Sequence, residues 1–175
     1  MGLTLSERFR AILQEPFKTV RNMGVSEGQS VVDVGAGTGY FTMPAASVVG
    51  RSGMVYAVEP DRARSERIRQ RAAMEGLGNV RVLTTGAEHL GEIPSGSVDL
   101  AFSAFSIHHF GDRQAGLEEV RRTLREGGRF YVWDRVPGAL VRHGTRPEEL
   151  QTLKGNFRGF EMLDSGRTLK ARFTK

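Results

Sequence analysis

The most informative segment of the chain reads Val31-Val32-Asp33-Val34-Gly35-Ala36-Gly37-Thr38-Gly39-Tyr40. Its first residues are mostly β-branched and follow a glycine, as expected for a strand buried on both faces of a parallel sheet. Three alternate glycines then lead into helix-like sequence. Glycine suits such a turn because its backbone reaches dihedral angles that other residues resist and because it lets a ligand approach the main chain closely. The segment therefore predicts a binding site for a nucleotide-like ligand at the carboxyl end of a buried strand.

Predicted strands and helices alternate along most of the chain. Short apolar, β-branched runs predict strands at residues 30–34, 54–58, 80–83, 97–104 and 129–133. Helical spacing of apolar residues predicts helices at residues 40–49, 61–74 and 114–124, the last of which we expect Gly127-Gly128 to end. Strands that alternate with helices form parallel sheets, because each helix returns the chain to the end of the sheet at which the strands begin.

The two ends of the chain have a different character. Apolar residues recur at helical spacing from Leu5 to Val20, within which Pro16 breaks or restarts a helix. Near the C-terminus, residues 157–163 and 168–173 resemble strands and are separated only by the turn-forming residues 164–167, which predicts an antiparallel hairpin. The sequence therefore predicts an α/β fold with a doubly wound, mostly parallel sheet of seven strands that ends in this hairpin.

Length and composition indicate a single folded domain. The 175 residues suit one domain with a helical lead-in (1–28), a core around the glycine turn (29–135) and a C-terminal loop, short helix and hairpin (136–175). No run approaches the roughly 20 apolar residues that a membrane helix needs, and the first residues lack the apolar core of a signal peptide. We therefore expect a cytoplasmic protein without membrane insertion. The absence of cysteine excludes disulfides, zinc–thiolate sites and cysteine nucleophiles.

The chain is basic, with a formal net charge of +5 and a pI of about 10.1. Five arginines fall within one predicted helix, at positions 62, 64, 67, 69 and 71. Such a balance permits nucleic-acid binding without requiring it. Glu66 lies within one helical turn of Arg62 and Arg69, so a solvated helix face with surface ion pairs is the favoured interpretation, and it applies equally to the later arginines at 121, 122 and 125.

The spacing of the glycines restricts the ligand. A dinucleotide-binding turn would need a further glycine where this chain has Tyr40, and a P-loop would need Gly-Lys-Ser or Gly-Lys-Thr after the glycines. Both absences favour a cofactor without a pyrophosphate. Glu59 stands at the end of the second predicted strand, 20 residues after Gly39 (59 minus 39). A carboxylate there can accept hydrogen bonds from both hydroxyls of a ribose.

These features resemble class I S-adenosylmethionine-dependent methyltransferases, whose first motif is similar to Asp-Val-Gly-Ala-Gly-Thr-Gly-Tyr at residues 33–40. The likeness is closest to the ubiquinone and menaquinone biosynthesis methyltransferases and runs from about Pro16 through the hairpin. It implies a Rossmann-like fold, S-adenosylmethionine as cofactor and S-adenosylhomocysteine as product. The resemblance assigns to the cofactor site the residues Asp33, Gly35, Ala36, Gly37, Thr38, Gly39, Tyr40, Glu59, Pro60, Gly86, Ala87, Glu88, Ser103 and Ala104.

One segment departs from the family pattern. Residues 85–90, Thr-Gly-Ala-Glu-His-Leu, resemble the Gly-Asp-Ala-Glu-x-Leu segment with which the family reads the adenine edge. Gly86 stands where the family has Asp, so the resemblance leaves the contact with the exocyclic amine to Glu88 or to a backbone carbonyl and implies weaker adenine binding. The alternative for Glu88 is a helix-capping or solvent-facing role.

Methyl transfer from a sulfonium needs alignment of the reactants, and a base where the acceptor carries a proton. His108 and His109 follow the fourth predicted strand and are candidate bases, since imidazole titrates near neutral pH; the alternative is that they order the loop. Two adjacent histidines without further ligands predict no metal site. Trp133 either walls the acceptor pocket or closes the core, the second being favoured, while Asp134 and Arg135 are expected to point toward the same crevice. His143 is a weaker candidate.

The methyl acceptor is left open by the sequence. A small molecule is the favoured acceptor, RNA or protein is the alternative, and a non-catalytic S-adenosylmethionine-binding protein or a nicotinamide-dependent reductase is a further one. In the family, additions to the core select the acceptor, and here these additions are short. We therefore expect either an open site or a pocket completed by a second subunit in a homodimer.

Overall fold

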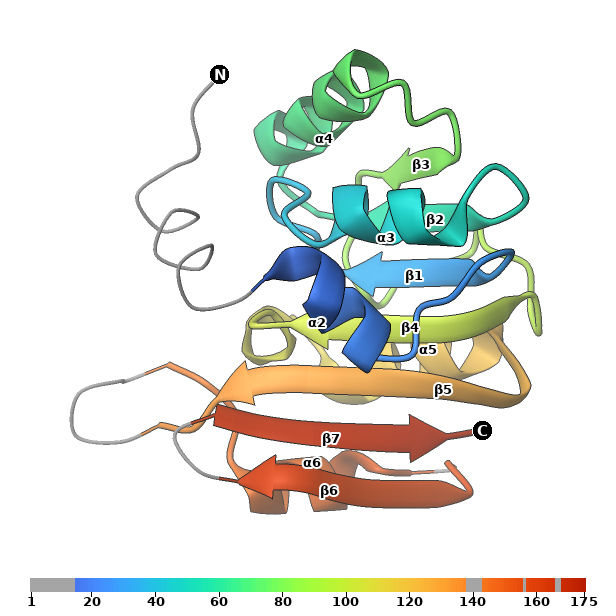
Figure 1. Cartoon of the computed structure of the whole chain (residues 1–175). Helices are drawn as coiled ribbons and strands as arrows, with labels where there is room; N and C mark the ends of the chain where they lie inside the picture. The colour runs from blue at the N-terminus through green and yellow to red at the C-terminus, as the bar shows by residue number, and fades with distance from the viewer. Residues whose placement is uncertain (1–14, 138–142, 156, 166–167) are drawn as a thin grey trace.

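Seven strands form one mixed sheet in the computed structural model, which describes residues 15–137, 143–155, 157–165 and 168–175. The strands are β1 (Ser30–Val34), β2 (Met54–Val58), β3 (Val80–Leu83), β4 (Val98–Ala104), β5 (Leu124–Arg135), β6 (Gly159–Ser165) and β7 (Thr168–Thr174). Their order is β3-β2-β1-β4-β5-β7-β6, with β1 to β5 parallel and β7 antiparallel to both of its neighbours (Figure 1). The predicted fold class, including the hairpin, is confirmed.

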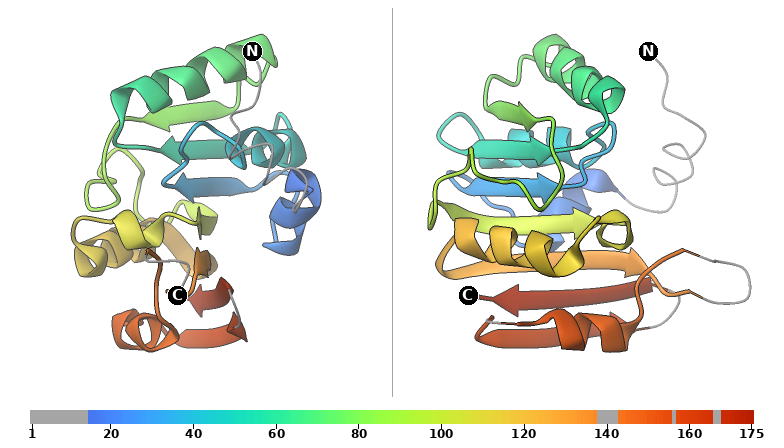
Figure 2. Two further views of the ribbon diagram at one scale, coloured as in Figure 1. Left: turned by 90° about the vertical axis from the view of Figure 1, so that its left-hand side faces the viewer. Right: turned by 180° about the vertical axis from the view of Figure 1, so that it is seen from behind.

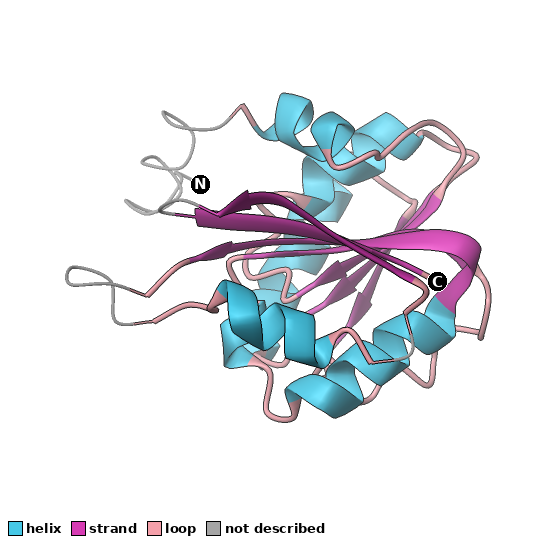
Figure 3. Cartoon of the chain, turned by 90° about the horizontal axis from the view of Figure 1, so that it is seen from below, coloured by secondary structure: helices cyan, strands magenta, loops and turns pink. Residues whose placement is uncertain are grey.

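Helices cover both faces of the sheet (Figures 2 and 3). The described helices are α2 (Pro16–Asn22), α3 (Thr42–Val49), α4 (Arg62–Met74), α5 (Arg113–Thr123), α6 (Pro147–Leu153) and the single 3-10 turn η1 (Ile107–His109). The helices α2 and α3 lie in front of the sheet in Figure 1, and α5 and α6 lie behind it. No helix in these parts of the chain is long and apolar enough to cross a membrane.

The position of β1 creates the crevice in which a ligand would bind. In the sheet, Val31 of β1 pairs with Val55 of β2 on one side and with Leu100 of β4 on the other. After β1 the chain therefore runs to β2 and β3 on one side of β1. It then crosses back to β4, on the other side of β1. The connections after β1 and β4 diverge, and the carboxyl ends of these two strands border an opening of the kind that holds ligands in doubly wound sheets.

Each layer of helices closes its own apolar core against the sheet. One cluster includes Val32, Leu117, Phe130 and Phe173 and lies under α5 and α6. The other includes Val20, Phe41 and Trp133 and lies under α2 and α3. Alternate residues of β5 contribute to the two cores, Phe130 and Val132 to the first and Tyr131 and Trp133 to the second, because successive side chains of a strand point to opposite faces.

One predicted boundary needs correction, and another is made more definite. The fifth strand begins at Leu124, directly after α5, and not at Arg129 as the glycine pair had suggested. The reason is tertiary: Leu124 pairs with Val98 of β4, and the backbones of Gly127 and Gly128 bond Lys175 at the end of the chain. At the N-terminus, Pro16 starts α2 at the first helical position, where its missing N–H costs nothing.

Part of the predicted N-terminal helix and the hairpin turn lie outside the described residues. Residues 5–14 belong to the first of these segments, and residues 166–167 belong to the second. The other expected helices and strands lie within a few residues of their predicted positions.

Candidate cofactor and acceptor site

A cavity of about 790 Å³ opens where β1, β2 and β4 end. This volume lies in the usual range for sites that hold cofactors or drug-sized ligands. The cavity is lined by twelve of the fourteen residues predicted for the cofactor: Asp33, Gly35, Ala36, Gly37, Thr38, Tyr40, Glu59, Pro60, Gly86, Ala87, Glu88 and Ala104. The other two, Gly39 and Ser103, lie behind the lining. Of the two candidate bases, His109 lines the cavity and His108 does not.

The glycine turn is tied to the neighbouring strand and leaves its main chain accessible. The N–H groups of Gly35 and Ala36 both donate to the carbonyl of Val58, at 2.8 and 2.9 Å. Gly35 has a φ of 78°, and a Cβ there would overlap Ser106. Gly37 has a φ of 59°, and a Cβ there would have no neighbour within 4 Å. The turn is therefore packed tightly at its start and open to the cavity at its middle.

Glu59 is held in place at the edge of this turn. Its side chain is buried, and its Oε2 accepts a hydrogen bond from the N–H of Gly37 at 2.8 Å. Its Oε1 accepts one from the N–H of Asp61 at 3.1 Å and lies 3.7 Å from Nη1 of Arg64. A carboxylate has about four acceptor positions. Two of them are used by these backbone donors, so the remainder are available to hydroxyl donors in the cavity.

Gly39 and Ser103 support the site from behind. A Cβ on Gly39 would come within 2.9 Å of Met43 Cε, so the glycine allows α3 and α4 to pack against the turn. Ser103 is fully buried and shares a 2.6 Å hydrogen bond with Ser106, whose hydroxyl also donates to the carbonyl of Val34 at 2.7 Å. This chain of bonds joins the segment after β4 to the end of β1.

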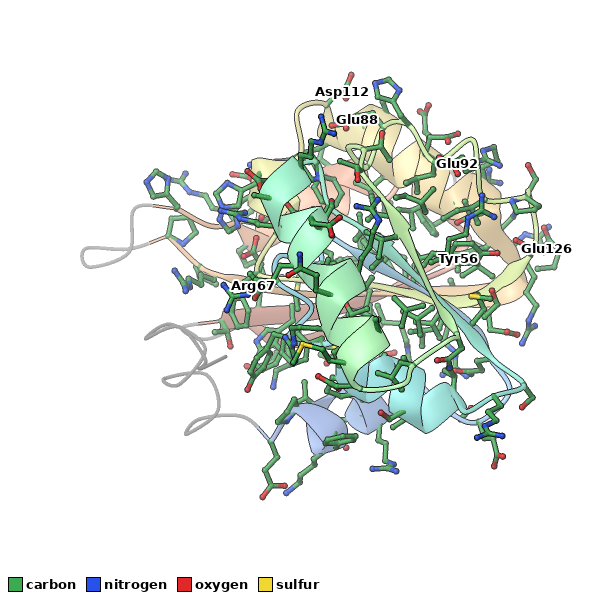
Figure 4. All side chains as sticks on the ribbon, turned by 90° about the horizontal axis from the view of Figure 1, so that it is seen from above. Tyr56, Arg67, Glu88, Glu92, Asp112 and Glu126 are labelled. Atoms are coloured by element: carbon green, nitrogen blue, oxygen red, sulfur yellow. The ribbon has the colours of Figure 1, made fainter. Side chains whose placement is uncertain are left out.

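The carboxylate of Glu88 occupies the space left by the missing side chain at position 86. A Cβ on Gly86 would overlap Oε2 of Glu88, while Oε1 accepts a hydrogen bond from the N–H of Asp112 at 2.8 Å. Glu88 and Asp112 lie close together in Figure 4. Glu88 therefore both tethers the start of α5 and presents a carboxylate to the cavity, so the two roles considered for it are compatible.

Asp33 is a buried acid at the bottom of the site. It accepts a hydrogen bond from the Thr42 hydroxyl at 2.7 Å. Burial raises the pKa of Asp33 to about 7; the Thr42 hydrogen bond opposes the shift, and the negative charge of Glu59 adds to it. Asp33 can therefore change its protonation state near neutral pH.

The residues at the end of β5 do not point into one crevice as expected. Asp134 is fully buried and bonds His108, so the expectation that it faces the cavity is wrong. Trp133 is also buried and packs against Phe41 and Phe105, with ring centroids 6.3 and 4.8 Å away, which agrees with the favoured core role. Among the described residues, its Nε1 has no hydrogen-bond partner. Successive residues of a strand face opposite sides of the sheet, which separates these two side chains.

Sequence patterns missed several lining residues. Phe41, Val58, Arg64 and Gly111 line the cavity without belonging to a recognisable motif. A signal existed for Arg64, which lies five residues after Glu59 at the start of α4. Phe105, in the segment that follows β4, also lines the cavity and has a φ of 58°, an uncommon value outside glycine that often marks functional sites.

Comparisons with known proteins agree with this geometry. Residues 32–132 match the methyltransferase domain family, so the chain belongs to it. A crystal structure of a SAM-dependent methyltransferase from Aquifex aeolicus superposes with a TM-score of 0.78 at 25% identity, covering 94% of this chain and 93% of that chain. The family is that of the class I S-adenosylmethionine-dependent methyltransferases, whose cofactor is S-adenosylmethionine.

Curated relatives share the central part of the chain. The ubiquinone/menaquinone biosynthesis C-methyltransferase of Hahella chejuensis is 33% identical over 115 residues, which are 65% of this chain and 46% of the relative. The aklanonic acid methyltransferase of Streptomyces sp. (strain C5) is 32% identical over 103 residues, which are 59% of this chain and 46% of the relative. The chain spans about half the length of the curated relatives that it matches.

Proposed function

We propose that this protein transfers a methyl group from S-adenosylmethionine to a small-molecule acceptor. The observation that carries the proposal is the buried Glu59 carboxylate, held by the N–H of Gly37 at the edge of a cavity of about 790 Å³. A ribose diol is the group that such a carboxylate suits, because two hydroxyls can donate to it together. The open main chain of the glycine turn lies beside it.

The same arrangement supports proposed roles for eleven of the fourteen residues predicted to contact the cofactor, while Thr38, Tyr40 and Pro60 line the cavity beside them. Glu59 would bind the ribose, and the segment from Gly86 to Glu88 would bind the adenine. The turn from Gly35 to Gly37, with Asp33 and Ala104, would hold the methionine end. Gly39 and Ser103 would act indirectly, since they support the cavity wall without lining it.

His109 is the proposed catalytic base. It is exposed at the cavity, and its pKa is lowered chiefly by partial burial and then by the neighbouring His108. A lowered pKa keeps the imidazole neutral at neutral pH, which is the form that accepts a proton. When bound, S-adenosylmethionine would supply an electrophilic methyl carbon on a sulfonium leaving group. A ring nitrogen of His109 would take the proton that the acceptor loses.

A small-molecule acceptor is favoured over RNA or protein. The names of the two relatives above refer to small molecules, ubiquinone and menaquinone in one and aklanonic acid in the other. Several arginines that could have formed a nucleic-acid surface are paired: Arg69 lies 3.7 Å from Glu66, Arg122 bonds Glu119 at 2.7 Å, and Arg125 bonds Asp99 at 2.7 Å. That the chain forms a single domain, assembles as a homodimer and is cytoplasmic stay predictions. A non-catalytic S-adenosylmethionine-binding protein stays the alternative to an enzyme.

Isothermal titration with S-adenosylmethionine, S-adenosylhomocysteine and NADH tests the proposal. We expect both sulfur compounds to bind and NADH not to bind. Loss of a charge-assisted hydrogen bond costs about 1.5–3 kcal/mol, so Glu59→Ala should weaken binding roughly 10- to 150-fold. Glu66→Ala removes an exposed carboxylate of α4 and is the matched control, with unchanged affinity. Circular dichroism checks that both variants fold.

Two outcomes would contradict parts of this proposal. Binding of NADH with no response to either sulfur compound would make the protein a nicotinamide-dependent one. If S-adenosylmethionine binds, an acceptor screen with a methyl-labelled cofactor should then show transfer to small acidic phenols, enols or carbon acids. Transfer only to RNA or protein would replace the small-molecule proposal.

A further inference from the structure

A buried carboxylate lies directly behind the histidine pair. Asp134, near the end of β5, is inaccessible to solvent, yet both of its oxygens have donors. Nδ1 of His108 lies 2.9 Å from Oδ1 and 2.9 Å from Oδ2. The N–H of Arg135 donates to Oδ1 at 2.8 Å, and the hydroxyl of Thr145 donates to Oδ2 at 2.7 Å. Three donors around one carboxylate satisfy it fully, which a buried acid requires.

This arrangement selects the protonation pattern of His108. An ionised carboxylate only accepts hydrogen bonds, so the Nδ1 of His108 must carry a hydrogen. The His108 side chain is only 8% exposed, and its ring lies against that of His109, with centroids 4.0 Å apart and planes inclined by 45°. The groups are therefore ordered from the buried carboxylate through His108 to His109 and then to the cavity.

Thr145 joins a second segment of the chain to this group. Its N–H donates to the carbonyl of Arg135 at 2.9 Å, and its side chain is fully buried beside Asp134. Gly144 precedes it, and a Cβ there would overlap the carbonyl of Arg135. The close approach of these backbones therefore depends on glycine and places the Thr145 hydroxyl at the carboxylate.

We infer that Asp134 is a positioning residue for the proton transfer: with Thr145 it fixes His108, and His108 in turn holds His109 at the acceptor side of the cavity. This inference rests on the proposed function. The inference also makes the class of acceptor more specific, because a base placed in this way serves an acceptor that must lose a proton, such as a phenol, an enol or an activated C–H group. The acceptor's O–H or C–H bond breaks, the proton passes to His109, and the electron pair remains to form the new bond to the methyl carbon.

The electrostatic surroundings of His109 support this order. The charged and titratable groups that act on it are His108 and Asp134 behind it, His143 from the segment before Thr145, and Arg64 from α4. Burial, His108, His143 and Arg64 lower the pKa of His109, and Asp134 alone raises it. Asp134 therefore prevents the base from becoming too weak while the other groups keep it neutral.

Nitrogen-15 NMR of the histidine rings tests the inference on the full chain with and without S-adenosylhomocysteine. We expect the Nδ1 of His108 to carry a hydrogen, because it lies 2.9 Å from both oxygens of Asp134. Asp134→Asn should lower the titration midpoint of His109, and Thr145→Val should produce a smaller shift in the same direction. His89→Gln, at an exposed position, is the control and should change neither signal. A bare Nδ1 on His108 in the wild type, or an unchanged midpoint in Asp134→Asn, would overturn the inference.

Binding and turnover separate this inference from the proposed function. Titration with S-adenosylhomocysteine should give the same affinity for wild type, Asp134→Asn and Thr145→Val, because none of these groups lines the cavity. With an acceptor found by the screen, Asp134→Asn should lower kcat at least tenfold, should change the KM for the cofactor little and should shift the pH profile. An unchanged kcat would refute the positioning role, whereas a wild type that binds no sulfur compound would refute the function itself.

Discussion

Gly35 and Gly37 both have positive φ values but differ in their surroundings. An alanine at 35 would be strained and would also overlap Ser106, so we expect Gly35→Ala to lower the free energy of unfolding by roughly 2–5 kcal/mol. An alanine at 37 meets no neighbour and should cost only about 1–2 kcal/mol. Its methyl group would lie at the cavity, so Gly37→Ala should instead weaken S-adenosylhomocysteine binding. Urea unfolding and calorimetric titration distinguish the two; equal losses of stability would contradict the difference in packing.

Asp33 should make stability depend on pH. The unfolded chain ionises this acid at its ordinary pKa of 3.8, whereas burial raises the folded pKa to about 7. Between these values the unfolded state loses its proton first, so the free energy of unfolding falls as pH rises, by roughly 4 kcal/mol in total, and levels off above the folded pKa. Asp33→Asn cannot ionise, so its advantage over the wild type should grow across this window in urea unfolding. Parallel curves for the two proteins would refute the assignment.

At the scale of elements, α5 anchors the loop between β3 and β4. Arg122 donates to the carbonyls of Leu90 and Ile93 at 2.9 and 3.0 Å. It also bonds Glu119, whose other oxygen accepts from the N–H of Leu90 at 3.1 Å. Hydrogen bonding between this pair raises the pKa of Arg122 and lowers that of Glu119. The loop begins with the residues proposed to bind adenine, so its order depends on a helix that follows it in the chain.

Removal of this anchor should loosen the loop without unfolding the protein. We expect Arg122→Ala to cost about 1.5–3 kcal/mol, the value of hydrogen bonds to a charged group, and to speed amide hydrogen exchange at Leu90. The control is Arg125→Ala, which removes a surface pair with Asp99 and should cost less than about 1 kcal/mol. Unfolding curves and exchange monitored by NMR provide the measurement. Unchanged exchange at Leu90 would show that the loop is held by other contacts.

At the scale of the whole molecule, the C-terminal hairpin completes the larger core. Phe173 of β7 is fully buried, and its ring lies 5.9 Å from Phe130, 5.1 Å from Phe157 and 5.0 Å from Phe160. We expect Phe173→Ala to lower the free energy of unfolding by about 3–5 kcal/mol, a large share of the total stability of a domain. Leu163→Ala, at a side chain that is 40% exposed, should have little effect.

This core is separate from the ligand site, which gives the prediction a second test. None of the four phenylalanine rings lines the cavity, so folded Phe173→Ala should bind S-adenosylhomocysteine as the wild type does. Its urea midpoint should nevertheless fall well below that of Leu163→Ala. A large loss of affinity in the folded variant would mean that the hairpin also shapes the cavity.

Local chemistry made much of this protein predictable. Buried β-branched runs predicted β1 and β2 with their observed bounds, and Asp61 caps α4 by accepting from the N–H of Arg64, where the predicted helix began. The glycine turn and Glu59 were recognisable because each depends on residues close to it in the chain. The start of β5 was not, because Leu124 and the glycine pair are held by β4 and by the last residue of the chain.

The amino-acid order alone was enough for the fold class and for most residues around the cavity, since period, glycine position and strand ends are local properties. Folding decided which histidine faces the cavity and which is bound to Asp134, 26 residues away in the chain. It also decided that Asp33 titrates near neutral pH, that Glu88 fills the space beside Gly86, and that Arg64 joins the lining. These features arise from burial and from contacts between distant segments, and neither is encoded at any single position.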